Sequence, residues 1–318
     1  MSHLSPSRRS LVVLALAASP VLMHAAVVIQ PSYDVSFSGS PNFAALKSTV
    51  ESAIAIYSYS LADNLTIPIT FKLDNAISGA QSSYGVVDYS FSSYLGKLQA
   101  GQSGANDATV VANLGAGPND PVVNAVNISV PQALAFALGL GSSQASYGTV
   151  TFNKTTYESN PAGLLGVIQH EVNEVLGTSS NLPNGGGTLP ATIMPSDLFR
   201  YTAAGARTFT TNGGSDPNNK AYFRISPFAS NIQEWNNLPN GGDYGDWAAN
   251  GSFPAAPQDN SGDSNTATSM AVSSAELQLL DAIGYNLNAV PEPGEWAMAT
   301  GVALAGFAGF RRLRRSTR

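Results

Sequence analysis

The sequence predicts an α+β fold, in which two strongly amphipathic helices accompany a small number of strands. Apolar residues recur at intervals of three and four over residues 41–61 and again over residues 161–176, which is the spacing of one face of an α-helix. Residues 67–73 alternate between apolar and polar, as a half-buried strand does. Beyond Gly177 the chain is rich in Gly, Asn, Pro and Ser, so we expect the C-terminal part to consist mainly of loops.

The first half of the domain contains the long helix and the first strand. The helix over residues 41–61 is expected to bury one apolar face, formed by Phe43, Leu46, Val50, Ile54, Tyr57 and Leu61. In the strand over residues 67–73, Pro68 is acceptable only near the strand start or at a sheet edge, because proline has no N–H to donate. Residues 76–100 are rich in Ser and Tyr, and a helix is expected around Tyr94.

The second half is predicted from shorter signals. Residues 122–140 combine an apolar, strand-like run with a short helix that begins at Pro131. A strand over residues 149–153 precedes the helix over 161–176, which Gly177 is expected to end. The remaining expected elements are two short strands and a last helix, at residues 207–210, 221–225 and 273–283.

Residues 1–26 have the pattern of a secretory signal peptide. Arg8 and Arg9 precede an apolar run from Leu11 to Ala18, and small residues follow at Ala25 and Ala26. The run is too short to span a bilayer. The arginine pair also resembles a twin-arginine signal, so the ordinary secretory route and the twin-arginine route both remain open, and either one predicts export.

The C-terminal residues 290–318 form a second targeting pattern. The motif Val290-Pro-Glu-Pro293 leads into an apolar stretch from Trp296 to Phe310, followed by an arginine cluster. This stretch is shorter than the roughly 20 residues of a spanning helix, and the arginines are typical of the cytoplasmic side of a membrane segment. The three-part tail resembles the PEP-CTERM sorting signal of Gram-negative bacteria. That resemblance implies an exosortase-type sorting enzyme as a partner, transient membrane retention through this tail alone, and a final place at the cell surface, in the extracellular matrix or in the medium.

The segment between the two signals, residues 27–289, is expected to fold as one domain. It contains 19 acidic and 8 basic side chains, a net charge of −11, without a basic patch, which argues against nucleic acid and anionic membranes as partners. The chain has no cysteine, which excludes disulfides and thiolate metal ligands. Since His3 and His24 lie in the predicted signal peptide, His170 is the only imidazole of the domain.

The stretch Gly166-Val-Ile-Gln-His-Glu-Val-Asn-Glu-Val-Leu-Gly177 carries the candidate chemistry. At about 100° per residue, His170, Glu171 and Glu174 share the face opposite to the apolar one. Side chains at i and i+4 can bind one ion, so His170 and Glu174 are candidate metal ligands. Glu171 projects beside them, where it could take a proton from an activated water. A solvated helix face with the same three residues is the alternative.

This helix and the elements before it resemble the metzincin zinc metalloproteases, whose active-site helix bears a His-Glu motif and ends at a glycine. Three further segments are similar to a group of exported bacterial proteins assigned as metalloproteases with PEP-CTERM tails, namely residues 196–205, 242–247 and 277–285. The resemblance implies a twisted mixed sheet with a long N-terminal helix, an active-site helix and a loop-rich C-terminal part. It also implies that the strand before the active-site helix, residues 149–153, binds extended substrate.

Carried over by position, the resemblance makes His170 the first zinc ligand, Glu171 the general base and Gly177 the turn glycine. Glu174 stands at the position of the second ligand, and Ser180 stands where metzincins place a third histidine. With no other histidine, the third ligand must be an oxygen or the new N-terminal amine; Asp197 is the first candidate, and Asp243 and Asp246 are the next.

Some assignments in this part of the chain have alternatives. Asp197 could instead pair with Arg200, and the Asp243/Asp246 loop could equally be a calcium site or a capped turn. Met270 and Met194 are rival candidates for the methionine that metzincins place beneath the metal. Tyr201 could contact the ion or belong to the core.

The predicted function is a metal-dependent endopeptidase that acts on peptide or protein substrates. Zinc is the expected metal, with Glu171 as general base, and calcium is the alternative ion. A non-catalytic surface or matrix protein on a degenerate protease scaffold is the competing prediction. The lack of a second imidazole and of a Gly-x-Ser-x-Gly elbow argues against a serine hydrolase. Spacing alone leaves open a carboxylate pair of the aspartic-protease or glycosidase type.

Overall fold

The computed structural model describes residues 26–182, 189–209, 220–238, 243–249, 252–260, 270–271 and 273–288. The predicted signal peptide, except its last residue, and the whole predicted sorting tail lie outside these residues. Within the described residues, no helix is both long enough and apolar enough to cross a membrane.

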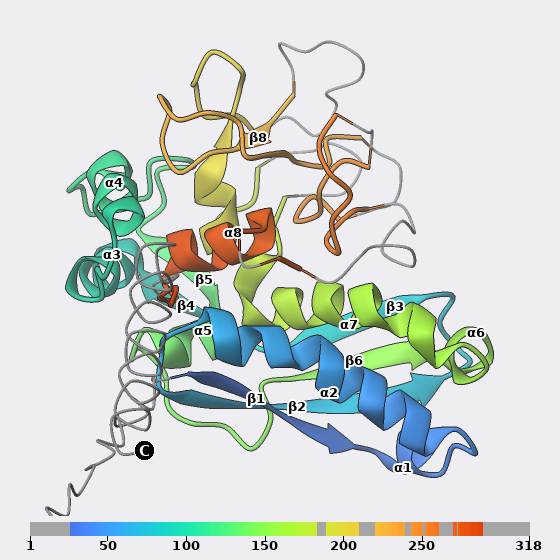
Figure 1. The fold of residues 1–318 in the computed structure, drawn as a ribbon. Coiled ribbons are helices and arrows are strands. Elements are labelled where there is room, and N and C mark those ends of the chain that lie inside the picture. Colours follow the sequence, from blue (N-terminus) through green and yellow to red (C-terminus); the bar gives the residue numbers. More distant parts are fainter. Residues whose placement is uncertain are drawn as a thin grey trace, which may run out of the picture.

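A four-stranded mixed sheet forms the base of the structure (Figure 1). Its strand order is β1 (Val27–Tyr33), β2 (Leu65–Asp74), β6 (Gly148–Asn153) and β3 (Ala80–Tyr84). The first three strands are parallel, and β3 lies antiparallel to β6 at one edge. The structure is therefore α+β with a mixed sheet, as the sequence predicts.

Strand β2 shows how the sheet fits its proline. The strand lies inside the sheet, yet Pro68 pairs with β1 alone, because β6 begins to pair at Ile69. The Pro68 carbonyl accepts a hydrogen bond from the Tyr147 N–H on the β6 side. Since the N–H and C=O of a strand residue point to the same side, the missing donor falls just before the β6 ladder and interrupts none of its bonds.

Two helices cover one face of this sheet, α2 (Phe43–Ser60) and α7 (Leu164–Asn173), and pack against each other (Figure 1). Alternate residues of β2 are fully or almost fully buried on this face, whereas the residues between them are partly exposed. Five of the six predicted core residues are buried, four within α2 and Leu61 just after it. The sixth, Phe43, is partly buried. At about 25 cal/mol per Å² of apolar surface, burial of this kind is the main stabilising contribution to the fold.

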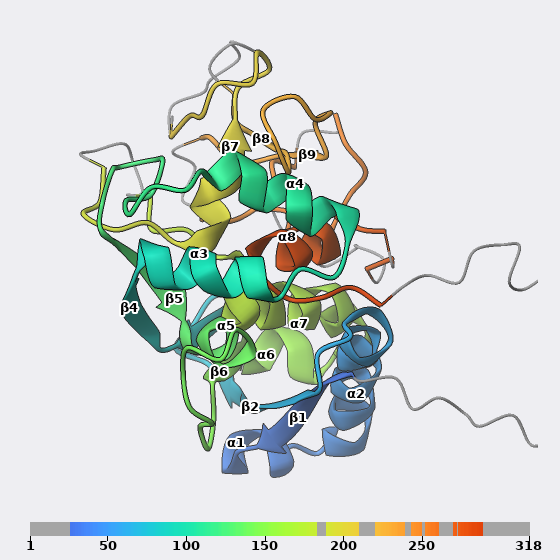
Figure 2. The same ribbon diagram turned by 90° about the vertical axis from the view of Figure 1, so that its left-hand side faces the viewer.

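The other elements form two further groups. Strands β4 (Val86–Ser90) and β5 (Asn127–Pro131) form an antiparallel pair. The helices α3 (Phe91–Ala100) and α5 (Gln132–Ala137) contact this pair, and α4 (Ala105–Leu114) follows α3 in the chain. Helices α3 and α4 pack on each other, and α4 also contacts α8 (Ala275–Ile283) (Figure 2). The C-terminal part contains a small sheet of β7 (Arg200–Tyr201), β8 (Tyr222–Phe223) and β9 (Gln233–Glu234).

Most predicted elements are confirmed, and the exceptions have local causes. The sequence pattern does not predict strands β1, β3 and β4 or helix α4. The apolar alternation of these strands and the apolar face of this helix are short or absent. The predicted strand at residues 207–210 is wrong for its described part, where Arg207 makes only an isolated bridge to Tyr201. The short α1 (Val35–Ser38), α6 (Lys154–Glu158), η1 (Pro161–Gly163) and η3 (Pro195–Phe199) complete the described elements named here.

Asp281 in α8 makes a pH-dependent contribution to stability. Burial and the charge of Asp107 raise the pKa of Asp281 to about 7, although its carboxylate accepts a hydrogen bond from the Leu287 N–H. The folded protein therefore keeps a proton that the unfolded chain loses near pH 4, so the stability associated with this group falls as the pH rises from about 4 to about 7. Asp281→Asn should remove this fall, which corresponds to about 4 kcal/mol for a carboxyl whose pKa is raised to about 7.

Urea unfolding of the parent and the Asp281→Asn variant at pH 4 and pH 8 would test this prediction. The variant should gain stability relative to the parent at pH 8 and not at pH 4. The same pH dependence in both proteins would show that Asp281 ionises normally in the fold.

Candidate metal centre

Helix α7 is followed by one wider turn, which contains a glycine with a positive φ angle. After Asn173 the chain makes a single π-helical turn, η2 (Glu174–Thr178), in which Gly177 has φ 129°. A Cβ atom at this position would also approach Ile283 and Leu134, at 3.1 and 3.4 Å. The backbone angle favours glycine, and a Cβ atom would also crowd the end of the Ile283 side chain, so the predicted end of the helix is confirmed.

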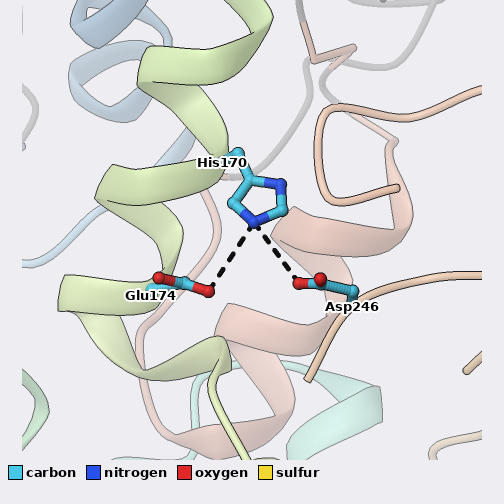
Figure 3. A group of neighbouring side chains, drawn as sticks. All are labelled: His170, Glu174 and Asp246. Carbon is cyan, nitrogen blue, oxygen red and sulfur yellow. Dashed lines mark ion pairs between the residues drawn. The ribbon is translucent and has the colours of Figure 1, made fainter. Parts of the chain in front are cut away.

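His170, Glu174 and Asp246 converge on one point (Figure 3). The His170 Nε2 atom lies 3.6 Å from Glu174 Oε1 and 3.3 Å from Asp246 Oδ1. One ligand atom from each residue lies within 4.8 Å of the other two. Among the described residues no other group of three such side chains comes together in this way.

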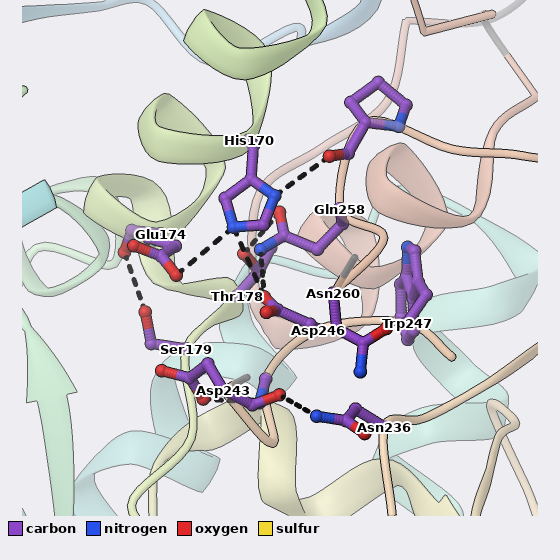
Figure 4. Close-up of polar contacts among 12 residues, drawn as sticks. His170, Glu174, Thr178, Ser179, Asn236, Asp243, Asp246, Trp247, Gln258 and Asn260 are labelled. Carbon is purple, nitrogen blue, oxygen red and sulfur yellow. Dashed lines mark hydrogen bonds and ion pairs between the residues drawn. The ribbon is translucent and has the colours of Figure 1, made fainter. Parts of the chain in front are cut away.

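The other ring nitrogen of His170 defines which atom is free for a ligand. Nδ1 lies 2.9 Å from the carbonyl oxygen of Pro257 (Figure 4). A carbonyl can only accept, so Nδ1 carries a proton and donates it. In a neutral ring Nε2 then has its lone pair directed toward the two carboxylates, which is the tautomer that metal-binding histidines use.

Each carboxylate also has a second partner that holds it in place, and Figure 4 shows the partner of Asp246. The Ser82 hydroxyl, in β3, donates to Glu174 Oε2 at 2.5 Å. The Gln258 amide donates to Asp246 Oδ1 at 3.1 Å, and Thr178 in turn donates to Gln258 Oε1 at 3.4 Å. Such outer contacts orient the ligands of metal sites and hold them ready.

The charges of the three residues are strongly coupled. Burial lowers the pKa of His170, but the charges and hydrogen bonds of Asp246 and Glu174 raise it by more than burial lowers it. The net pKa is therefore well above its usual value. Burial raises the pKa of Glu174, but hydrogen bonding and charge from His170 bring it below its usual value. For Asp246 burial dominates and the pKa is raised, although His170 acts in the opposite direction. Without a metal, an imidazolium therefore bridges two carboxyl groups, and metal binding would release its proton.

Glu171 is buried beside Glu174 instead of facing solvent. Its side chain is 5% exposed, and burial together with the charge of Glu174 raises its pKa well above the usual value. It also shares a side-chain hydrogen bond with Glu174, whose own pKa is lowered. Val167 on the same face is 4% exposed, and the side chains of His170 and Glu174 are each 14% exposed. The alternative of a solvated helix face is therefore wrong.

Asp197 does not join this group. Its Oδ1 accepts from the Ser180 hydroxyl at 2.6 Å, and its Oδ2 accepts from the N–H groups of Asn181 and Met194. It organises the loop before η3, and Asp246 takes the place that the sequence suggested for Asp197. Asp197 and Arg200 form no direct ion pair among the described residues, although burial raises the pKa of Asp197 and the charge of Arg200 acts in the opposite direction. The buried Arg200 guanidinium donates to the carbonyls of Tyr244 and Asn236 and to Asn237.

The remaining candidates have other positions. Asp243 Oδ1 accepts from the Gly245 N–H at 2.7 Å, which is the capped turn named as an alternative; burial and the charges of Asp246 and Glu174 raise its pKa to about 7. Met270 packs on α7, where its sulfur accepts from Asn173, whereas Met194 contacts Asp197. Tyr201 is 1% exposed and belongs to the core.

Comparisons with protein-family models, curated proteins and solved structures found no match to this chain. What defines the protein is therefore its own geometry: an α+β fold with a His/Glu/Asp group that could bind a metal ion.

Proposed function

We propose that this protein is a metal-dependent peptidase of metzincin-like fold, with His170, Glu174 and Asp246 as metal ligands. The observation that carries the proposal is the convergence of these three side chains next to Glu171. Catalytic zinc sites use three protein ligands and keep one position open. The donor set fits such an ion, because it offers two oriented carboxylates and the Nε2 atom of His170, which can release its proton and bind through its lone pair.

The donor set also bears on the identity of the metal. Calcium prefers six to eight oxygen ligands, whereas this group includes an imidazole nitrogen and brings together three residues. Zinc fits that combination better, and manganese is the alternative among oxygen-rich sites. Two carboxylates in place of histidines leave more negative charge at the site, so the activity should be shifted toward alkaline pH relative to a three-histidine site.

The roles of the side chains follow from their positions. When bound, a zinc ion would acidify a water molecule and polarise the substrate carbonyl. Glu171 lies on the same helix turn as His170, where it can accept a proton from the attacking water and deliver it to the leaving amine. The Pro257 carbonyl and the Ser82 hydroxyl hold the imidazole and the Glu174 carboxylate in their orientations.

The substrate would bind along β3 in this proposal. The strand expected to bind it, residues 149–153, is β6, whose two sides are both paired, with β2 and with β3. That expectation is corrected: among the described strands β3 is the edge on this side, and Ser82 links it to Glu174. An extended peptide could add to its free side by backbone hydrogen bonds.

One observation favours the non-catalytic alternative. The His170 imidazolium is neutralised by Glu174 and Asp246, so the group can exist as a structural ion network that needs no metal. Export and surface sorting are part of the proposal in either case and rest on residues 1–26 and 290–318.

An experiment that removes the metal and then adds it back distinguishes the peptidase from the non-catalytic structural protein. The purified protein should contain about one equivalent of zinc by mass spectrometry and cleave peptides in a mixed library. Dialysis against a chelator should abolish cleavage, and zinc should restore it. A protein that folds normally, binds no transition metal and cleaves nothing would support the structural alternative.

A further inference from the structure

We propose that Glu276, in the first turn of α8, is a positioning residue of the candidate metal centre. Its carboxylate joins the segment that carries Asp246, residues 243–249, to the segment that carries Pro257, residues 252–260. We refer to these as the ligand loop and the support loop. This inference rests on the proposed function, because it concerns how the third metal ligand is held.

One oxygen of Glu276 contacts both loops. Glu276 Oε1 accepts from Trp247 Nε1 at 3.2 Å and from the Gln258 N–H at 3.4 Å. Trp247 directly follows the ligand Asp246, and Gln258 directly follows Pro257, whose carbonyl accepts from His170. A single carboxylate oxygen therefore binds the residue next to Asp246 and the residue next to Pro257, which orients His170.

The two loops are also bonded to each other at the same place. The Trp247 N–H donates to the Gln258 carbonyl at 2.8 Å, and the Asn260 N–H donates to the Trp247 carbonyl at 3.0 Å. The Gln258 side chain reaches Asp246 Oδ1 itself. A shift of either loop relative to α8 would therefore move the third ligand.

Helix α8 can serve as the fixed point because it is part of the core. Leu277, Leu279 and Leu280 are completely buried, and Ser274 caps the helix through the Leu277 N–H. An acidic side chain in the first turn is also favoured by the helix dipole. The ligand loop contains no helix or named strand, so its position depends on contacts such as this one.

The burial of Glu276 costs folding free energy, so a contribution to stability does not explain why a carboxylate stands at this position. The residue is 0% exposed, and its second oxygen, Oε2, is buried without a hydrogen-bond partner among the described residues. A buried carboxyl with an unsatisfied oxygen destabilises a fold. Its benefit is to hold two loops together where one of them supplies a ligand.

Zinc affinity of variants tests the inference. Kd for Zn²⁺ would be measured by competition with a chromogenic chelator for the parent, Glu276→Gln and Glu276→Ala. We expect affinity to fall in that order, by about 10- to 100-fold for the alanine variant, which is the usual effect of losing an outer-shell partner. The absorption spectrum of bound Co²⁺ should change as well, because the geometry of Asp246 changes.

Leu279→Ala provides the matched control, since it removes a buried side chain from the same helix. It should lower the unfolding midpoint without changing the Zn²⁺ affinity or the Co²⁺ spectrum. If Glu276→Ala does not fold, Trp247→Phe removes the Nε1 donor to Glu276 together with part of a buried ring that packs on Trp235 and Phe223. It should weaken Zn²⁺ binding in the parent and weaken it little further in Glu276→Gln.

The outcomes separate this inference from the proposed function. A parent protein that binds no Zn²⁺ would overturn both. A parent that binds Zn²⁺ tightly, with equal affinity in the Glu276 variants, would leave the proposed function intact and overturn the positioning role.

Discussion

Glu171→Gln should lower the kcat for peptide hydrolysis by about 10²- to 10⁴-fold, the usual contribution of a general base. The amide has nearly the same shape but cannot accept and return a proton. Because Glu171 is not one of the three converging ligands, bound zinc should stay at the level of the parent. The measurement is kcat and KM on one peptide together with metal content.

Glu51→Gln is a suitable control for the same chemical change, because Glu51 lies on the exposed side of α2 and pairs with Lys47. It should leave both activity and zinc unchanged. If Glu171→Gln kept the full activity of the parent, Glu171 would not be the base. If neither protein hydrolysed any peptide, the structural alternative would gain support.

Asp246→Asn should weaken Zn²⁺ binding by more than about 100-fold, because removal of outer-shell partners alone already costs 10- to 100-fold. The amide oxygen is a poorer ligand, and the variant loses one of the negative charges around His170. Equilibrium competition with a chelator measures this change directly.

Asp197→Asn is the matched comparison, since both aspartates are buried and both were candidates for the third ligand. Asparagine has a single acceptor oxygen, so either the Ser180 hydroxyl or the N–H groups of Asn181 and Met194 would lose their acceptor, and stability should fall by about 1–3 kcal/mol. Its zinc affinity should be that of the parent. The opposite pattern, with zinc lost only in Asp197→Asn, would reverse the assignment of the third ligand.

The elements that the sequence predicted are those with long regular patterns. The first helix and the site helix have apolar faces that continue for several turns, and β2 alternates over its whole length. Strand β3, Ala80-Gln-Ser-Ser-Tyr84, has no such alternation because it lies at a sheet edge and buries little. Its position beside the site follows from pairing with β6, which no local pattern encodes.

The same distinction applies within the site. The pairing of His170 with Glu174, the adjacent Glu171 and the end at Gly177 were determined by the sequence alone, because helical geometry places residues four apart on one face. The third candidate ligand was decided by tertiary structure. Asp197, Asp243 and Asp246 all lie outside regular helices and strands or in a short 3₁₀ segment, where spacing along the chain does not set direction. Contacts with Gln258 and with the segment around Glu276 bring Asp246 to His170, and such contacts exist only once the C-terminal loops have packed onto the core.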